Sequence, residues 1–142
     1  MNPLAVLLPA LHAALTAPAL ELAGAAVPVG QYFDVAQAGP YVEIDQPTDT
    51  DLSGASLCGP FSCTVLLNVV TQFPARAVSG LPAEALVSQI NARLRGQRLP
   101  LPAGWDCQPG TLEPGLQLKE TDGEQRLVRR LLRYRWNLSF HP

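Results

Sequence analysis

The side chains best able to do chemistry in this sequence are three cysteines and two histidines. The cysteines are Cys58, Cys63 and Cys107, and the histidines are His12 and His141. An odd number of cysteines with no CxxC pair argues against a disulfide framework, and the spacing matches no zinc motif. The two histidines stand near opposite ends of the chain, which argues against a shared catalytic site. We therefore expect no metal and no cofactor, and we interpret Cys63 as a small buried hydrophobe.

A second pattern that could bind a metal is a short acidic stretch in the first half of the chain. Asp49, Asp51, Ser53 and Gly54 match the opening positions of a calcium-binding EF-hand loop. The last position of such a loop requires a bidentate Glu, but here it is Pro60, and no flanking helices are evident. We interpret the stretch as a solvated acidic loop.

The hydroxyl side chains offer no nucleophile with a partner. Ser62 and Thr64 have no base at a plausible spacing, and the sequence contains no Gly-rich phosphate loop and no nucleophile elbow. The sequence therefore predicts that this protein is not an enzyme.

The net charge of −2 over 142 residues hides two oppositely charged halves. Residues 1–75 hold six acidic residues and no Lys or Arg, whereas residues 76–142 hold ten Lys and Arg and six acidic residues. Such a division suits head-to-tail self-association at least as well as binding of nucleic acid.

Arginines cluster near the carboxyl end of the chain. They are Arg126, Arg129, Arg130, Arg133 and Arg135. They could contact nucleic acid or an acidic protein surface. The alternative, which we favour over DNA recognition, is a solvated strand face with long side chains lying along the sheet. Tyr134 and Trp136 fall on the opposite, core parity of this segment, which argues against a base-stacking platform.

The elements that position these residues are arranged around residues 61–73, the longest β-prone run. The large apolar side chains of this run share one parity: Phe61, Cys63, Val65, Leu67, Val69 and Phe73. The alternation predicts a central strand with one buried face.

Two helices are predicted. Leucines recur at helical spacing over residues 4–15, so a first helix should end before Pro18 or continue raggedly toward Gly24, with His12 on its flank. A second helix should begin at Pro82 and stop at Gly96, and its apolar stripe should pack on the central strand. The first segment has no preceding Lys or Arg and is interrupted by Pro9 and His12, so we expect neither a cleaved signal peptide nor a membrane span.

The remaining segments are predicted as strands and connections. Residues 27–35 should form a short edge strand interrupted by Pro28, and residues 41–45 a second strand. We expect a long polar loop at residues 46–60 and a stiff connector at 99–105, with Trp105 as a lid on the core.

The last third is predicted to be a hairpin. Residues 116–120 alternate, Asp122-Gly123 is a turn signal, and residues 124–140 return as a strand. A rival interpretation is a basic amphipathic helix around residues 127–132, but the turn before this segment and the aromatic alternation after it favour a strand.

Taken in order, these elements resemble the tail terminator (tail-completion) family of long-tailed bacteriophages. The resemblance is carried by residues 39–44, 61–73, 83–94 and 126–135, and it extends from the first helix to the end of the chain. The Pro- and Gly-rich segment at 46–60 and the Pro-rich connector at 99–110 depart from the family pattern. At 142 residues, the whole chain, 1–142, is expected to form a single domain.

The resemblance implies an α+β fold with an antiparallel-rich β-sheet and two helices packed on one face. It also implies a virion protein of the phage tail or neck, assembled in the host cytoplasm. Such a protein forms a homo-oligomer, a hexameric ring, that caps the tail tube protein, ends tail polymerisation and offers a surface to a head-completion or neck protein. DNA would pass through the lumen without specific binding, and no membrane is involved.

Six residues are candidates for the interfaces of such a ring. The hypothesis places the acidic Asp45, Asp49 and Asp51 toward the lumen or the tail tube, and Arg129, Arg133 and Arg135 against an acidic neighbour. The alternatives are a neck or head-closure adaptor protein and a small nucleic-acid-binding module that uses the Arg-rich C-terminal strand.

Overall fold

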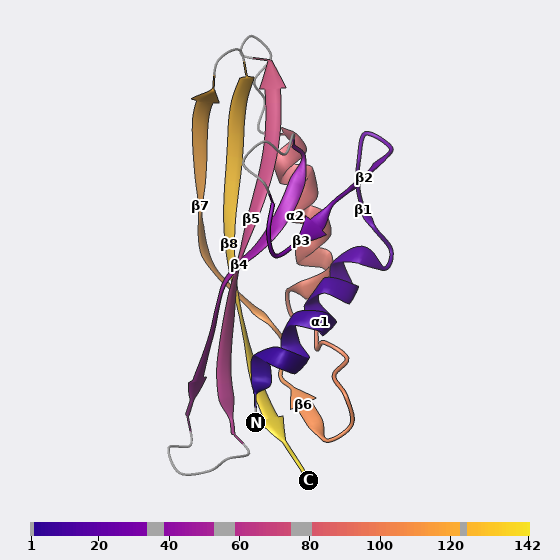
Figure 1. The fold of residues 1–142 in the computed structure, drawn as a ribbon, viewed down its shortest axis with the longest axis vertical. Coiled ribbons are helices and arrows are strands. Elements are labelled where there is room, and N and C mark those ends of the chain that lie inside the picture. The colour runs from indigo at the N-terminus through magenta and orange to yellow at the C-terminus, as the bar shows by residue number, and fades with distance from the viewer. Residues whose placement is uncertain (1, 34–38, 53–58, 75–80, 123–124) are drawn as a thin grey trace.

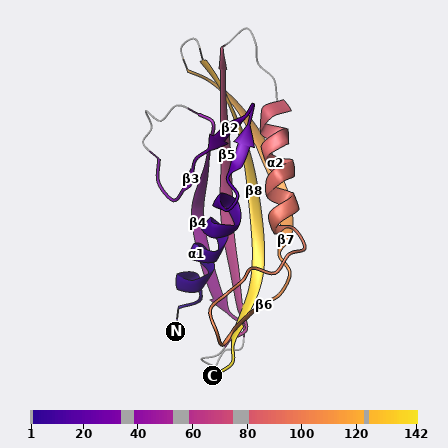
Figure 2. The same ribbon diagram turned by 90° about the vertical axis from the view of Figure 1, so that its right-hand side faces the viewer.

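The chain folds as an α+β unit in which two helices cover one face of a β-sheet (Figures 1 and 2). The computed structural model describes residues 2–33, 39–52, 59–74, 81–122 and 125–142, without the side chains of residues 73, 74, 81, 115–122, 125 and 126. The helices are α1 (Pro3–Thr16) and α2 (Leu81–Leu94). The strands are β1 (Leu20–Leu22), β2 (Ala25–Val27), β3 (Val29–Gly30), β4 (Tyr41–Asp51), β5 (Phe61–Pro74), β6 (Trp105–Cys107), β7 (Thr111–Asp122) and β8 (Gln125–Phe140).

Strand β5 lies at the centre of the main sheet, as predicted. The order is β3-β4-β5-β8-β6, with β7 also paired to β8, and β1 and β2 form a separate hairpin. All pairs are antiparallel except the short edge pair β3–β4. The predicted core parity of β5 is confirmed, because Cys63, Val65, Leu67 and Val69 are fully buried.

Both helices begin and end where their sequences predict. Asn2 caps α1 by accepting a hydrogen bond from the Leu4 N–H at 3.1 Å, and Pro3 occupies the first turn, where no N–H is needed. Helix α2 ends at Leu94, and Gly96 then adopts φ +72°, a left-handed conformation that glycine accepts without a Cβ clash. The apolar stripe of α2 is buried in the core shared with β5.

Strand β8 confirms the predicted alternation and excludes the rival helix. Its core-facing side chains are buried: Val128, Leu132, Tyr134, Trp136 and Leu138. The predicted hairpin is present, because β7 pairs with β8 up to Asp122↔Gln125. Residues 123–124, where the turn was predicted, lie outside the described residues.

The predicted loop at residues 46–60 is wrong over its first half. Strand β4 continues to Asp51 and pairs with β5 as far as Phe61, with a β-bulge between Asp45 and Thr48. The backbone pairing outweighs the polar composition. Pro47 is tolerated because it lies in the bulge, past the two β4 residues that pair with β3. Residues 53–58 lie outside the described residues.

Two other predicted segments have different bounds in the structure. Strand β7 begins at Thr111, and its own bulge, between Glu113 and Leu116, accommodates Pro114. The predicted strand at 27–35 is split at Pro28 into β2 and the edge strand β3, and its last two residues lie outside the described part.

The predicted lid on the core is present. The half-buried Trp105 ring lies beside two aromatic rings, with its centre 6.3 Å from that of Phe61 and 5.3 Å from that of Phe140.

Candidate assembly surfaces

The bulge in β4 divides the three predicted acidic residues between the two faces of the sheet. Before the bulge, Asp45 pairs with Leu66, whose side chain points to the face opposite the helices, here called the outer face. After the bulge, Asp49 pairs with Cys63 and Asp51 pairs with Phe61, both on the helix-covered side. The expected single acidic loop is therefore wrong: Asp49 and Asp51 belong to a strand, and Asp45 faces the other way.

The thiol beside Asp49 is buried and protonated. Burial raises the pKa of Cys63 to about 12, and the negative charge of Asp49 adds to this shift. Burial also raises the pKa of Cys107. Both cysteines are free, and the interpretation of Cys63 as a buried hydrophobe is confirmed. Cys58 lies outside the described residues.

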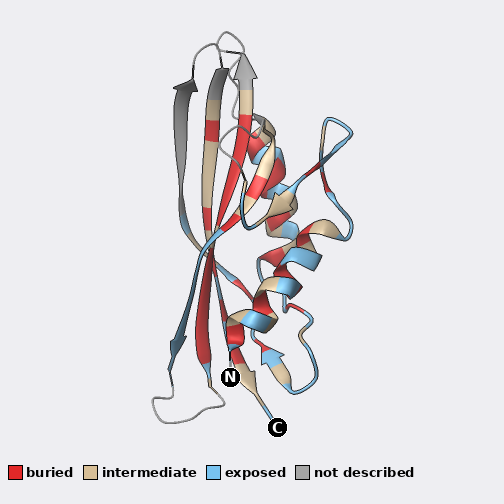
Figure 3. Cartoon of the chain, viewed as in Figure 1, coloured by how far each residue is buried: buried red, intermediate tan, exposed pale blue. Residues whose placement is uncertain are grey.

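The three predicted arginines share the outer face. Arg129 pairs with Val70, Arg133 with Leu66 and Arg135 with Thr64 in the β5–β8 ladder. The face has no helix over it, yet β5 residues on this face are buried: Ser62, Thr64, Asn68 and Val70. Long side chains on the neighbouring strands lie along the sheet and cover them, as the favoured interpretation expected. Figure 3 shows the resulting buried track along β5 beside the exposed end of β4.

Two of these arginines are bonded within the chain. Arg135 donates from Nε and Nη2 to Glu113 Oε1 on β7, at 2.9 and 2.6 Å, and from Nη1 to Ser62 Oγ on β5, at 2.7 Å. Arg133 Nη2 donates to Gln46 Oε1 at 3.2 Å, which reaches the bulge of β4. The two guanidinium groups thus connect β8 to β7, β5 and β4 across the outer face.

The neighbouring Arg130 points to the helix side instead, where its Nη1 lies 3.5 Å from Glu84 Oε1 of α2. Sequence spacing could not identify Gln46, Glu113 or Glu84 as partners, because each comes from another part of the chain. The only local signal was the parity of β8, which separates Arg130 from Arg129, Arg133 and Arg135.

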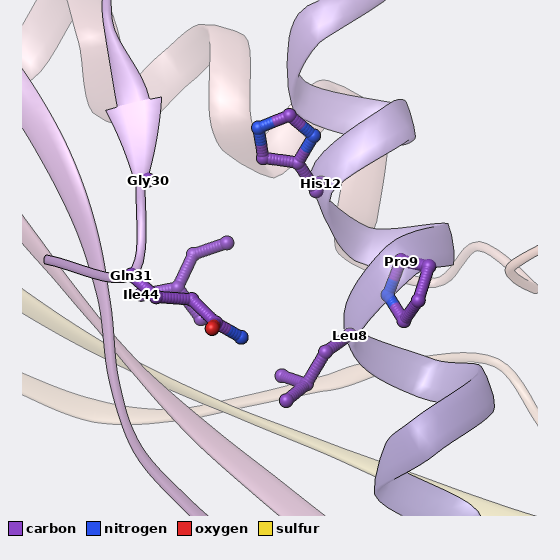
Figure 4. A pocket seen from close by; sticks show the side chains of 6 residues that line it. All are labelled: Leu8, Pro9, His12, Gly30, Gln31 and Ile44. Carbon is purple, nitrogen blue, oxygen red and sulfur yellow. The ribbon is translucent and has the colours of Figure 1, made fainter.

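Two open hollows flank α1. The first, of about 390 Å³, lies between α1 and the β3–β4 edge and is lined by Leu8, Pro9, His12, Gly30, Gln31 and Ile44 (Figure 4). His12 is exposed, as predicted, and its Nε2 lies 3.2 Å from the Val29 carbonyl oxygen. Among the described residues that line this hollow, His12 is the one titratable side chain.

The second hollow, of about 440 Å³, lies between the amino-terminal half of α1 and the Pro-rich connector. Every side chain that lines it is apolar: Ala5, Val6, Pro9, Ala10, Pro100, Leu101 and Pro102. A hollow without a polar side chain among its described lining residues suits an apolar side chain from a partner better than a substrate, which needs polar side chains to fix its orientation.

Within the described part of the chain, no three His, Cys, Asp or Glu side chains lie together as metal ligands. None of the helices described is long and apolar enough to cross a membrane.

The fold matches a solved structure over nearly its whole length. A chain of the structure titled as the virion of a native gene transfer agent (GTA) particle superposes with a TM-score of 0.59 at 18% sequence identity. The match covers 95% of this chain and 94% of that chain. No family model and no curated protein matches the sequence. At this identity the likeness is one of fold.

Proposed function

We propose that this protein is a structural component of a phage-like virion and that it acts as a tail terminator. In this proposal it forms a hexameric ring that caps the tail tube, ends tail polymerisation and presents a surface to the head-completion or neck protein. It works by binding other proteins and catalyses no reaction.

The observation that carries the proposal is the fold likeness to a chain of a gene transfer agent virion, which extends over almost the full length of both chains. The sequence resemblance to tail terminators rests on the order of strands and helices, and it supports the same broad class, a structural protein of a phage-like virion.

The charges of the chain fit subunit and partner contacts. The six predicted interface residues belong to two surfaces in this proposal. Asp49 and Asp51 lie at the end of β4, whereas Asp45 and the arginines 129, 133 and 135 lie on the outer face. The outer face carries both signs of charge, which suits a protein partner from the tube or neck better than the uniformly negative backbone of DNA.

Nucleic-acid binding is the weaker alternative for the same arginines. Arg135 is held by Glu113 and Arg133 by Gln46, so capture of a phosphate would have to compete with bonds already made. Tyr134 and Trp136 are buried in the core and offer no stacking platform.

The proposal is tested by polymerising the tail tube protein encoded by the same genome, with and without this chain, and measuring tube lengths by electron microscopy. We expect tubes with a ring at one end that stop growing when the chain is added. Without it, or with a chain unfolded by Leu67→Asp in the core, growth should continue.

Three results would contradict the proposal. Tubes that are unaffected, together with binding of the chain to connector-bearing heads, would favour a neck or head-closure adaptor. A monomer that binds duplex DNA with a steep salt dependence would favour a nucleic-acid module. Binding along the sides of the tube would exclude a capping role.

A further inference from the structure

We infer that neighbouring copies of this chain join head to tail by inserting Leu52, at the end of β4, into the apolar hollow between α1 and the Pro-rich connector. This inference rests on the proposed ring, and it names the knob and the hollow through which the copies meet.

Leu52 is suited to be the knob. Two large apolar side chains of the described residues are mostly exposed, Tyr32 at 86% and Leu52 at 57%, and both lie at the β3–β4 edge of the sheet. The backbone at Leu52 is held, because its N–H donates to the Pro60 carbonyl oxygen at 2.9 Å. With the backbone already anchored, only the Leu52 side chain has to be ordered on binding, which limits the entropy cost.

The hollow lies on the helix-covered side of the sheet, and its connector wall leads into β6, the strand at the edge opposite β3 and β4. One row of the sheet runs through Asp51, Phe61, Leu138 and Cys107, so the residue before Leu52 and strand β6 are separated by three strand spacings, about 14 Å in all. The end of β4, the start of α1 and β6 all lie at the lower end of the molecule in Figure 1. Leu52 does not line the hollow of its own copy. Between copies, a knob and a hollow at different places on the surface generate a head-to-tail series, which closes into a ring if the rotation allows.

The two sides are complementary in chemistry. The end of β4 carries the exposed carboxylates of Asp49 and Asp51 beside Leu52, with no Lys or Arg in the strand. Helix α1 contains no charged residue, and the connector side carries Arg95 and Arg98. Arg98 Nη1 lies 3.6 Å from Asp106 Oδ1 in an exposed ion pair, so the two arginines and Asp106 together leave this side net positive. Arg98 lies at the β6 edge, where its Nη1 donates to the Cys107 carbonyl oxygen at 3.1 Å. The apolar knob, with carboxylates beside it, therefore approaches an apolar hollow with a basic margin. This match of shape and charge favours a second copy as the occupant.

The test uses two variants and two matched controls, each measured by native mass spectrometry and negative-stain microscopy, alone and with tail tube present. Ala5→Glu fills the hollow with a charge at an exposed helix position, and Leu52→Ser removes the knob. The controls are Ala13→Glu, exposed on α1 but outside the hollow, and Tyr32→Ser, the other exposed apolar side chain. We expect rings from the wild type and both controls, and self-association weakened about tenfold or more in the two test variants, since the apolar contact is lost.

Mixing the two test variants gives the decisive result. The intact knob of Ala5→Glu fits the intact hollow of Leu52→Ser, whereas both remaining sites are defective. An equimolar mixture should therefore stop at a one-to-one dimer, which also shows that both variants are folded.

Rings formed by either test variant alone, or lost only in Tyr32→Ser, would overturn the inference and leave the proposed function standing. Loss of tube binding in Ala5→Glu with its rings intact would assign the hollow to the tube protein and overturn the inference too. A wild type that forms no ring, alone or with tube, would refute the proposed function itself.

Discussion

Arg135 and Glu113 join the last strand to β7 through two hydrogen bonds to a single carboxylate oxygen, at 2.9 Å from Nε and 2.6 Å from Nη2. The pair is partly exposed, with 45% of the Arg135 and 33% of the Glu113 side chain accessible. Any experiment that reverses the charge of Arg135 therefore changes a bond within the chain as well as a surface.

We predict that this pair contributes about 0.5–1 kcal/mol to the free energy of unfolding, the range of partly exposed ion pairs with good geometry. A double-mutant cycle of Arg135→Gln and Glu113→Gln in urea should measure this coupling. The swapped variant Arg135→Glu/Glu113→Arg should recover much of the stability that Arg135→Glu loses. A coupling energy of zero would contradict the prediction. If the swap also restores ring formation, the role of Arg135 lies within the chain and not at an acidic neighbour.

The two faces of the central strand should respond differently to truncation. Leu67→Ala removes a fully buried side chain and should lower the free energy of unfolding by about 2–5 kcal/mol. Leu66→Ala, one residue away on the outer face, should cost about 1 kcal/mol or less, because that side chain is only half-buried. Equal costs in chemical denaturation would mean that the outer face is packed as tightly as the core.

Gly110 should not tolerate a larger side chain. A Cβ there would lie 2.5 Å from Trp136 Nε1 and 2.9 Å from the Leu94 carbonyl oxygen. We predict that Gly110→Ala costs about 1–3 kcal/mol and shifts the tryptophan fluorescence, because the buried indole must move. Gly30→Ala is the matched control, since its Cβ would meet only Phe33 ring atoms at 3.5 Å. Unchanged fluorescence and stability in Gly110→Ala would contradict the prediction.

Alkaline pH should destabilise the fold through Tyr134. Burial raises the pKa of this phenol to about 12, whereas an unfolded tyrosine ionises near pH 10. Below pH 10 both states hold the proton and the contribution is fully present; as pH rises from 10 toward 12, the unfolded state loses its proton first and the free energy of unfolding falls. The fall should be shallower in Tyr134→Phe, measured by urea denaturation at pH 8, 10 and 11. The raised pKa of Cys63 also lowers the free energy of unfolding at alkaline pH, but equally in the wild type and in Tyr134→Phe. If the free energy of unfolding fell in parallel with pH in these two proteins, a contribution from Tyr134 would be excluded.

Most of the fold was predictable because its strongest patterns are local. The parity of residues 61–73, the 3.6-residue stripe that ends at Gly96 and the alternation of β8 each depend on side chains close together in sequence. The largest failure was at residues 46–51, where Pro47 and a polar composition indicate a loop. Their pairing with β5 depends on residues well outside this segment, so composition alone could not reveal it.

The candidate surfaces were less predictable for the same reason. A bulge exchanges the face of the sheet on which every later residue of its strand lies. Asp45 and Asp49 therefore lie on opposite faces, although an even number of positions, four, separates them. The hollow between α1 and the Pro-rich connector forms between segments at least 90 residues apart, and no pattern in either segment indicates it.

The two long outer strands of the sheet, β4 and β7, each carry a proline in a bulge, Pro47 and Pro114. A proline cannot donate to an added strand, and a bulge bends the backbone away from a flat template. While copies accumulate before assembly, these two kinks should keep them from stacking edge on edge into amyloid-like fibres.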